Sequence, residues 1–87
     1  PQVAGAGVDE AQAEAQNIPF EVSKLSLSDV PRALAANDTR GFIKLIRNTE
    51  TDKLIGARIV APEGGELIQQ LSMAIKNGIT VKELAES

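Results

Sequence analysis

The sequence predicts an α+β fold in which helices pack on one face of an antiparallel sheet, within a single domain covering residues 1–87. Residues 41–48 and 53–61 alternate apolar and polar side chains around a polar turn at 49–52, which is typical of a β-hairpin. Further along, apolar residues recur at helical spacing and form one stripe: Leu67, Ile68, Leu71, Ala74 and Ile75. A sheet and a helix with matching apolar faces are therefore expected to supply the core.

The first two predicted elements are a short strand and a helix. Residues 3–6 form an apolar run that stops at Gly7, as expected of a strand. Asp9 then precedes a run rich in alanine and glutamate, and its carboxylate can accept hydrogen bonds from the free amides of a first helical turn. We expect this helix to end near Gln16.

The segment 20–27 is predicted to be a strand whose alternation changes phase. Its first two apolar residues, Phe20 and Val22, would face one side, whereas its last two, Leu25 and Leu27, would face the other. A bulge or face switch near residues 23–24 would reconcile the two halves. Residues 31–36 are expected to form a turn or one loose helical turn.

The hairpin is expected to supply the sheet side of the core. Five of its residues share the predicted inner face: Ile43, Leu45, Ile55, Ala57 and Ile59. Phe42 and Ile46 lie on the opposite face of the same strand, so this strand is expected to be covered on both sides, by the loop after Val30 or by another domain.

The C-terminal part is predicted to contain two helices. The first spans about 64–77, and Gly78 fits the left-handed position that closes a helix. The second starts at Thr80, with Glu83 placed for a capping box. Three of its residues are expected to face inward: Val81, Leu84 and Ala85.

The composition argues against catalysis by these residues. The 87 residues include no Cys and no His, so the chain lacks a thiolate nucleophile and the usual acid–base group near neutral pH. A net charge of −3 without a cluster of Lys and Arg indicates no nucleic-acid partner. We expect a cytoplasmic protein, because the absence of cysteines gives no sign of an oxidising compartment. We expect no membrane partner, because no apolar run approaches the length of a bilayer span.

Three short patterns are interpreted as structural features. Gly5 and Gly7 resemble the start of a dinucleotide fingerprint, but Glu10 stands where a third glycine or alanine is required. The acidic residues of segment 63–66 are expected to complement the start of a helix. Arg32 and Arg40 are expected to form salt bridges with Asp29 or Asp38 in preference to an anion site. We therefore predict no catalytic, cofactor-binding or metal-binding residue.

The helix at 64–77 carries a candidate subunit interface. With its apolar stripe turned to the core, its opposite and flanking faces present Gln69, Gln70, Met73 and Lys76. A methionine among uncharged amides suits adaptable contact, so Gln69, Gln70 and Met73 are the predicted dimer contacts.

Two sequence blocks carry a family resemblance. Residues 30–46 read VPRALAANDTRGFIKLI, and residues 56–69 read GARIVAPEGGELIQ. Together with the opening VAGAG and the closing MAIKNGITVKELA, they resemble the C-terminal dimerisation (interface) domain of mercuric reductases, which are flavin-dependent pyridine-nucleotide disulfide oxidoreductases.

The resemblance implies that the chain is a segment, truncated at both ends, of a longer protein that we call the parent. The parent would reduce Hg(II) to Hg(0) with NADPH through FAD. It would form a homodimer in which this domain contacts its symmetry mate and the flavin and NADPH domains. No catalytic or metal-binding residue of the family carries over to a position here.

Two alternatives remain open at this stage. The domain could belong to a dihydrolipoamide dehydrogenase or a related disulfide reductase, or it could be a stand-alone protein-binding domain. Cofactors are expected in the parent alone, and the 87 residues themselves are expected to be non-catalytic.

Overall fold

The computed structural model describes residues 2–29, 40–61 and 65–85. The elements follow one another as β1 (Gln2–Gly7), α1 (Glu10–Ala15), β2 (Phe20–Ser26), the short 3-10 helix η1 (Leu27–Asp29), β3 (Phe42–Asn48), β4 (Leu54–Ala61), α3 (Gly65–Lys76) and α4 (Val81–Ala85). The predicted turn at 31–36 lies outside the described residues.

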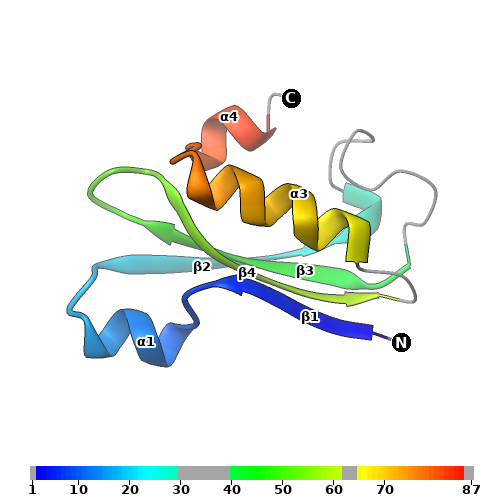
Figure 1. The fold of residues 1–87 in the computed structure, drawn as a ribbon, viewed down its shortest axis with the longest axis horizontal. Helices are drawn as coiled ribbons and strands as arrows, with labels where there is room; N and C mark the ends of the chain where they lie inside the picture. Colours follow the sequence, from blue (N-terminus) through cyan, green and yellow to red (C-terminus); the bar gives the residue numbers. More distant parts are fainter. Residues whose placement is uncertain (1, 30–39, 62–64, 86–87) are drawn as a thin grey trace.

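The four strands form one antiparallel sheet in the order β1-β4-β3-β2. Helices α3 and α4 lie on one face of this sheet, and α1 lies on the opposite side, beyond the end of β1 (Figure 1). The predicted α+β fold with an antiparallel sheet is confirmed. The first strand of the chain, β1, lies at one edge of the sheet, where it pairs with the last strand, β4.

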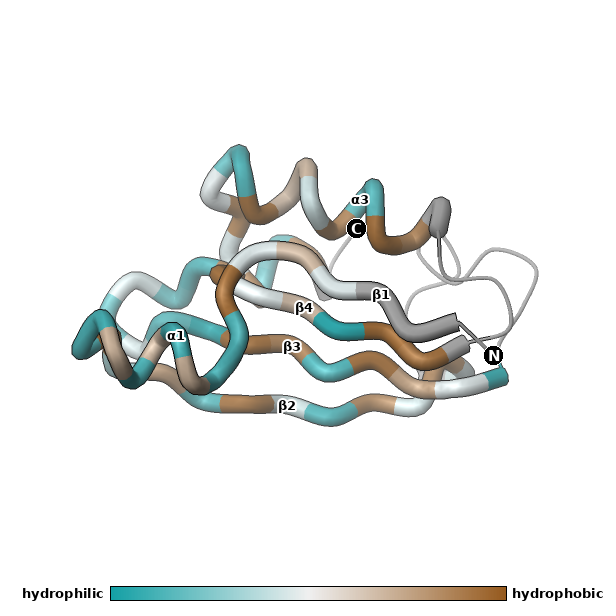
Figure 2. The backbone as a smooth tube through the Cα atoms, turned by 60° about the horizontal axis from the view of Figure 1, so that its bottom comes forward, coloured by the Kyte–Doolittle hydropathy of each residue, from teal (hydrophilic) through white to brown (hydrophobic). Residues whose placement is uncertain are grey.

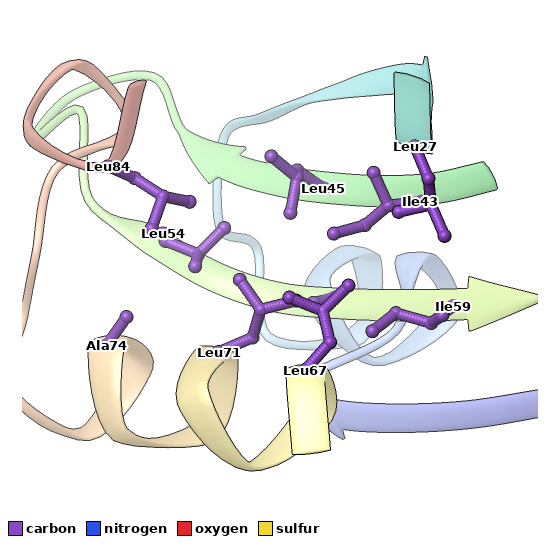
Figure 3. Packing of buried hydrophobic residues seen from close by; sticks show 10 residues of the cluster. Leu27, Ile43, Leu45, Leu54, Ile59, Leu67, Leu71, Ala74 and Leu84 are labelled. Atoms are coloured by element: carbon purple, nitrogen blue, oxygen red, sulfur yellow. The ribbon is translucent and has the colours of Figure 1, made fainter. Parts of the chain in front are cut away.

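The main core lies between the sheet and α3. Its buried members come from η1, β3, β4, α3 and α4: Leu27, Ile43, Leu45, Leu54, Ala57, Ile59, Leu67, Leu71, Ala74 and Leu84. Figure 3 shows Leu67 and Leu71 pointing from α3 toward β4. Burial of these apolar side chains is the main source of stability, since the described residues contain no buried polar or charged residue.

The prediction for Ile55 is wrong, because a bulge changes the face on which it lies. Ile46 pairs with Gly56 and Arg47 pairs with Leu54, so Ile55 is the extra residue between two ladder positions. Leu54 takes the core position and is 1% exposed, whereas Ile55 is half-buried outside the main cluster. The other four predicted hairpin residues are buried in the core.

The predicted bulge in β2 is also wrong. Residues Phe20 to Ser26 pair one-to-one with Asn48 to Phe42, without a register shift. The phase change arises because both faces of β2 carry apolar side chains. Leu25 shares the core face with its partner Ile43 but is 37% exposed on this edge strand, and Leu27 enters the core from η1, beyond the strand.

Helix α1 starts as predicted, with a cap that is reciprocal. Asp9 Oδ1 accepts from the amide of Gln12 at 2.8 Å, and Gln12 Oε1 accepts from the amide of Asp9 at 2.9 Å. Ala13 is the buried residue of this helix and is 0% exposed. Ile46, on the sheet face away from α3, is buried as well, so β3 is covered on both sides at this residue, whereas Phe42 on the same face is half-buried. The predicted cover by the loop after Val30 or by another domain lies outside the described residues.

The C-terminal helices also end and begin as predicted. Gly78 has φ 67°, and the amides of Gly78 and Ile79 donate to carbonyls in the last turn of α3. Thr80 then caps α4, because its hydroxyl accepts from the amide of Glu83 at 3.1 Å while the Glu83 carboxylate accepts from the amide of Thr80 at 3.0 Å. The amide of Val81 donates to the carbonyl of Asp52, which attaches the start of α4 to the hairpin turn.

The capping box predicts a pH dependence of stability. The hydrogen bond from the Thr80 amide, followed by that from its hydroxyl, lowers the pKa of Glu83 below its ordinary value of 4.5. A carboxyl whose pKa is lowered by folding stabilises the fold above its unfolded pKa, and this contribution is lost as pH falls through the folded pKa. Glu83→Gln should therefore reduce the loss of stability below pH 4.5, measured by urea unfolding at stepped pH. An unchanged pH profile would contradict this role of Glu83.

Candidate functional site

Helix α3 presents two faces of different character. Its inner face packs Leu67, Leu71 and Ala74 against the sheet, where α3 lies over β1 and β4. Gln69, Gln70 and Met73 are exposed, and Met73 is 61% exposed. The structure therefore leaves all three predicted interface residues accessible on one helix, with a large apolar side chain among them.

The outer face of α3 has a shallow hollow of about 420 Å³. It is lined by Gln69, Ser72, Met73 and Lys76, which follow the i, i+3, i+4, i+7 spacing of one helix stripe. The hollow brings Gln69 and Met73 together, whereas Gln70 is exposed but does not line it. Ser72 is not among the predicted interface residues, although the same helical spacing identifies it.

The chemistry of this surface suits binding and offers no reacting group. It combines a polarisable thioether, a hydroxyl and uncharged amides, with Lys76 as the cation at its C-terminal end. A flexible methionine adapts to a facing surface, and protein interfaces are enriched in Met and depleted in charge at their centre. We define Gln69, Gln70, Ser72 and Met73 as the α3 patch.

The glycines of β1 serve backbone packing. Gly7 has φ 69°, and a Cβ there would lie 2.2 Å from the carbonyl oxygen of Ile55. Gly56, its partner in β4, faces the turn after β1, where a Cβ would lie 2.0 Å from the carbonyl oxygen of Val8. The interpretation of this segment as a strand end that needs close backbone approach is confirmed at Gly7, whereas a Cβ at Gly5 would make only ordinary contact, with its nearest atom at 3.5 Å.

Arg47 joins three parts of the fold. Its guanidinium donates to Glu21 on β2 and to Asp52 in the hairpin turn, each at 3.1 Å. The hydrogen bond to Glu21 is the main cause that raises the pKa of Arg47. Because all three side chains reach solvent, this group ties β2 to the hairpin at modest energetic gain.

Several predicted features cannot be placed. Arg32, Asp38 and residues 63–64 lie outside the described residues, so the interpretations of Arg32, Arg40 and the 63–66 segment remain predictions. Within the described ranges, no group of three Asp, Glu, His or Cys side chains is arranged to hold a metal ion. None of the helices described here has the length and apolar character needed to span a bilayer.

Comparisons with known sequences find matches over essentially the whole chain. The family model described as pyridine nucleotide-disulphide oxidoreductase, dimerisation domain, matches residues 1–87. The mercuric reductase of Shewanella putrefaciens is 54% identical over 86 residues, which are 99% of this chain and 15% of that protein. The mercuric reductase of Staphylococcus aureus is 39% identical over 87 residues, which are 100% of this chain and 16% of that protein. The chain thus spans about a sixth of the length of these relatives.

Solved structures agree with the fold over nearly the whole chain. LpdA from Mycobacterium tuberculosis superimposes with a TM-score of 0.78 at 33% identity, covering 100% of this chain and 19% of that one. A NAD-dependent persulfide reductase from A. fulgidus gives a TM-score of 0.75 at 27% identity, covering 98% of this chain and 16% of that one.

Proposed function

Because this chain belongs to the dimerisation-domain family of the pyridine nucleotide-disulphide oxidoreductases, we propose that it joins two copies of an NADPH- and FAD-dependent mercuric reductase. In this proposal the parent is a cytoplasmic homodimer that reduces Hg(II) to Hg(0). The observation that supports it is the 54% identity to a mercuric reductase over 99% of the chain, against 33% for LpdA. The second candidate is the matching domain of a related disulfide reductase.

The residues present do not fit a bound dinucleotide. The turn after Gly5 and Gly7 carries Glu10 where the dinucleotide fingerprint requires a third glycine or alanine. The hollow beside these glycines is lined by carboxylates as well as cations, namely Asp9, Glu10, Lys44 and Arg58. The chain also has no cysteine to hold Hg(II) as a thiolate. We therefore assign FAD, NADPH and mercury to other domains of the parent, and subunit pairing to this one.

The activity test uses the purified parent protein. We expect NADPH oxidation that depends on Hg(II), visible flavin absorbance and a dimeric mass in sedimentation. Oxidation driven instead by a small disulfide such as oxidised lipoamide, without response to Hg(II), would favour the disulfide-reductase candidate. A monomeric protein without flavin would favour a stand-alone binding domain and contradict both.

The α3 patch predicts where new charge disrupts the dimer. At a two-fold axis the same surface meets itself, so each introduced charge faces its own copy. Gln70→Glu with Met73→Glu should therefore raise the dimer dissociation constant by at least about tenfold, since like charges brought together in an interface cost several kcal/mol. Sedimentation velocity over a concentration series measures this change, and mercury reduction should fall in parallel.

A matched control adds the same two charges elsewhere. Thr49 and Thr51 are exposed in the hairpin turn and do not belong to the α3 patch. Thr49→Glu with Thr51→Glu should leave the dimer unchanged. If the α3 double variant also sediments as an undisturbed dimer with full activity, then α3 does not form the interface.

A further inference from the structure

The sheet face away from α3 carries a row of three cations. Lys24 lies directly opposite Lys44, and Lys44 lies directly opposite Arg58, on the neighbouring strands β2, β3 and β4. Directly opposed residues project to the same face of an antiparallel sheet. Figure 2 shows the three hydrophilic segments side by side across these strands. We call Lys24, Lys44 and Arg58 the basic row.

The basic row works against the stability of the isolated domain. Like charges placed directly opposite each other in a sheet are destabilising, and this row occurs in a chain whose net charge is −3. Lys44 forms an ion pair with Glu10 of α1. Lys24 lies 4.3 Å from the centre of the Phe42 ring. In the part of the chain that the structure describes, neither Lys24 nor Arg58 forms an ion pair with a carboxylate.

Apolar residues flank the basic row on both sides. Phe42 and Val60 are paired on one side of it, and Val22 and Ile46 are paired on the other. Phe42, Val60 and Val22 are only half-buried. A solvated face of an antiparallel sheet normally carries polar side chains throughout, so charges set between half-exposed apolar pairs indicate a surface that another structure covers.

Helix α1 covers one end of this face only. Between α1 and the sheet lies a hollow of about 490 Å³, whose lining includes Lys44, Ile46 and Arg58 from the sheet and Asp9 and Glu10 from the start of α1. The side chain of Arg58 extends beside Gly5. A Cβ added to Gly5 would lie 3.8 Å from the Nε atom of Arg58. The absence of a side chain at Gly5 thus leaves the guanidinium accessible from the open side of the sheet.

We propose that the basic row docks onto a carboxylate-bearing surface from the flavin- and NADPH-binding part of the same polypeptide, and this inference rests on the proposed function. The Shewanella putrefaciens relative is long enough to supply such a surface, because this chain covers only 15% of it. Carboxylates would pair with Lys24 and Arg58 while the docked surface covers the flanking apolar residues. A second copy is a poor occupant, because a two-fold axis here would place cations against cations.

Zero-length cross-linking of the full-length parent tests this directly. A water-soluble carbodiimide joins a lysine amine to a contacting carboxylate as an amide, and the carbodiimide takes up the water that is lost. We expect Lys24 to be joined to Asp or Glu residues outside the 87-residue segment, whereas Lys44, which is paired with Glu10, should be joined to Glu10 in any case. Mixing light and heavy-isotope protein before cross-linking shows whether both residues come from one polypeptide, as we expect.

The other outcomes contradict the proposal. Cross-links of Lys24 confined to carboxylates of the segment would show an uncovered face. Cross-links between light and heavy chains would show that the face meets another subunit. Failure of the proposed function would appear separately, as a wild-type parent without Hg(II)-dependent NADPH oxidation, and would not alter the cross-links.

Charge reversal gives a second, independent measurement in the parent. Arg58→Glu would place a carboxylate against the docked carboxylates, so amides of β2 and β3 should exchange hydrogen for deuterium at least about tenfold faster as docking loosens. Lys82→Glu reverses an exposed cation on α4, which is on the opposite side of the sheet, and should not change this exchange. Equal exchange in the two variants would overturn the proposal.

Discussion

Replacing Leu71 with alanine should lower the free energy of unfolding by about 3 kcal/mol, which lies within the range for a fully buried leucine. Leu71 is 0% exposed and packs from α3 into the main core. Native proteins are stabilised by roughly 5–15 kcal/mol in total, so this one change should remove about a fifth to three fifths of the stability. Urea unfolding followed by circular dichroism measures the change.

Met73 provides the matched control on the same helix. Its side chain is 61% exposed, so Met73→Ala removes contacts with solvent and leaves no cavity in the domain. We expect a change within about 0.5 kcal/mol in the 87-residue chain. Similar losses for Leu71→Ala and Met73→Ala would mean that α3 does not pack on the sheet with the face described here.

Replacing Gly56 with alanine should also cost about 3 kcal/mol, through a different mechanism. The added Cβ would lie 2.0 Å from the carbonyl oxygen of Val8, a distance that backbone atoms cannot tolerate. The turn after β1 would have to move away, and the hydrogen bond from the Val8 amide to the Ile55 carbonyl, now 3.0 Å, would be lost. Thermal and urea unfolding should both report the loss.

Gly5 separates this steric cause from a general effect of replacing glycine. A Cβ at Gly5 would meet its nearest atom at 3.5 Å, which is ordinary contact. Gly5→Ala should therefore be neutral or slightly stabilising, because alanine reduces the freedom of the unfolded chain. A stable Gly56→Ala variant would show that β1 and its following turn do not approach β4 as closely as described.

The predictable parts of the fold are those in which local signals agree. The hairpin, α3 and its closing Gly78, and the caps at Asp9 and Thr80 each combine a periodic pattern with suitable end residues. These elements appear with bounds close to those predicted. The partner of β1 could not be predicted from the sequence, because nothing in a short glycine-rich strand identifies β4, which lies so much later in the chain.

The two errors in the strands have different physical origins. Alternation reports which residues share a face only while the ladder is regular. At Ile46 and Arg47 the register shifts, which exchanges the roles of Leu54 and Ile55. In β2 the ladder is regular, and the irregular pattern reflects apolar residues on both faces. Composition alone does not distinguish a shifted register from a two-sided strand.

The α3 patch and the basic row also differ in how far the sequence predicts them. The α3 patch follows from helical spacing within one element, so its exposed residues could be named from the sequence. The basic row depends on the register of three strands, with members separated by 14 or more positions, as between Arg58 and Lys44. In the sequence its cations are scattered, and only the pairing brings them together.

The pairing of β1 with β4 also has a consequence for synthesis on the ribosome. Gly7 finds its partner Gly56 about 50 positions later in the chain. At about 5–20 residues per second, β1 would wait on the order of 2.5–10 seconds before β4 is made. The hairpin can form as it emerges, whereas the first strand must stay unpaired during this interval. Its small Ala and Gly side chains give a nascent strand with little tendency to join those of neighbouring chains before the sheet is closed.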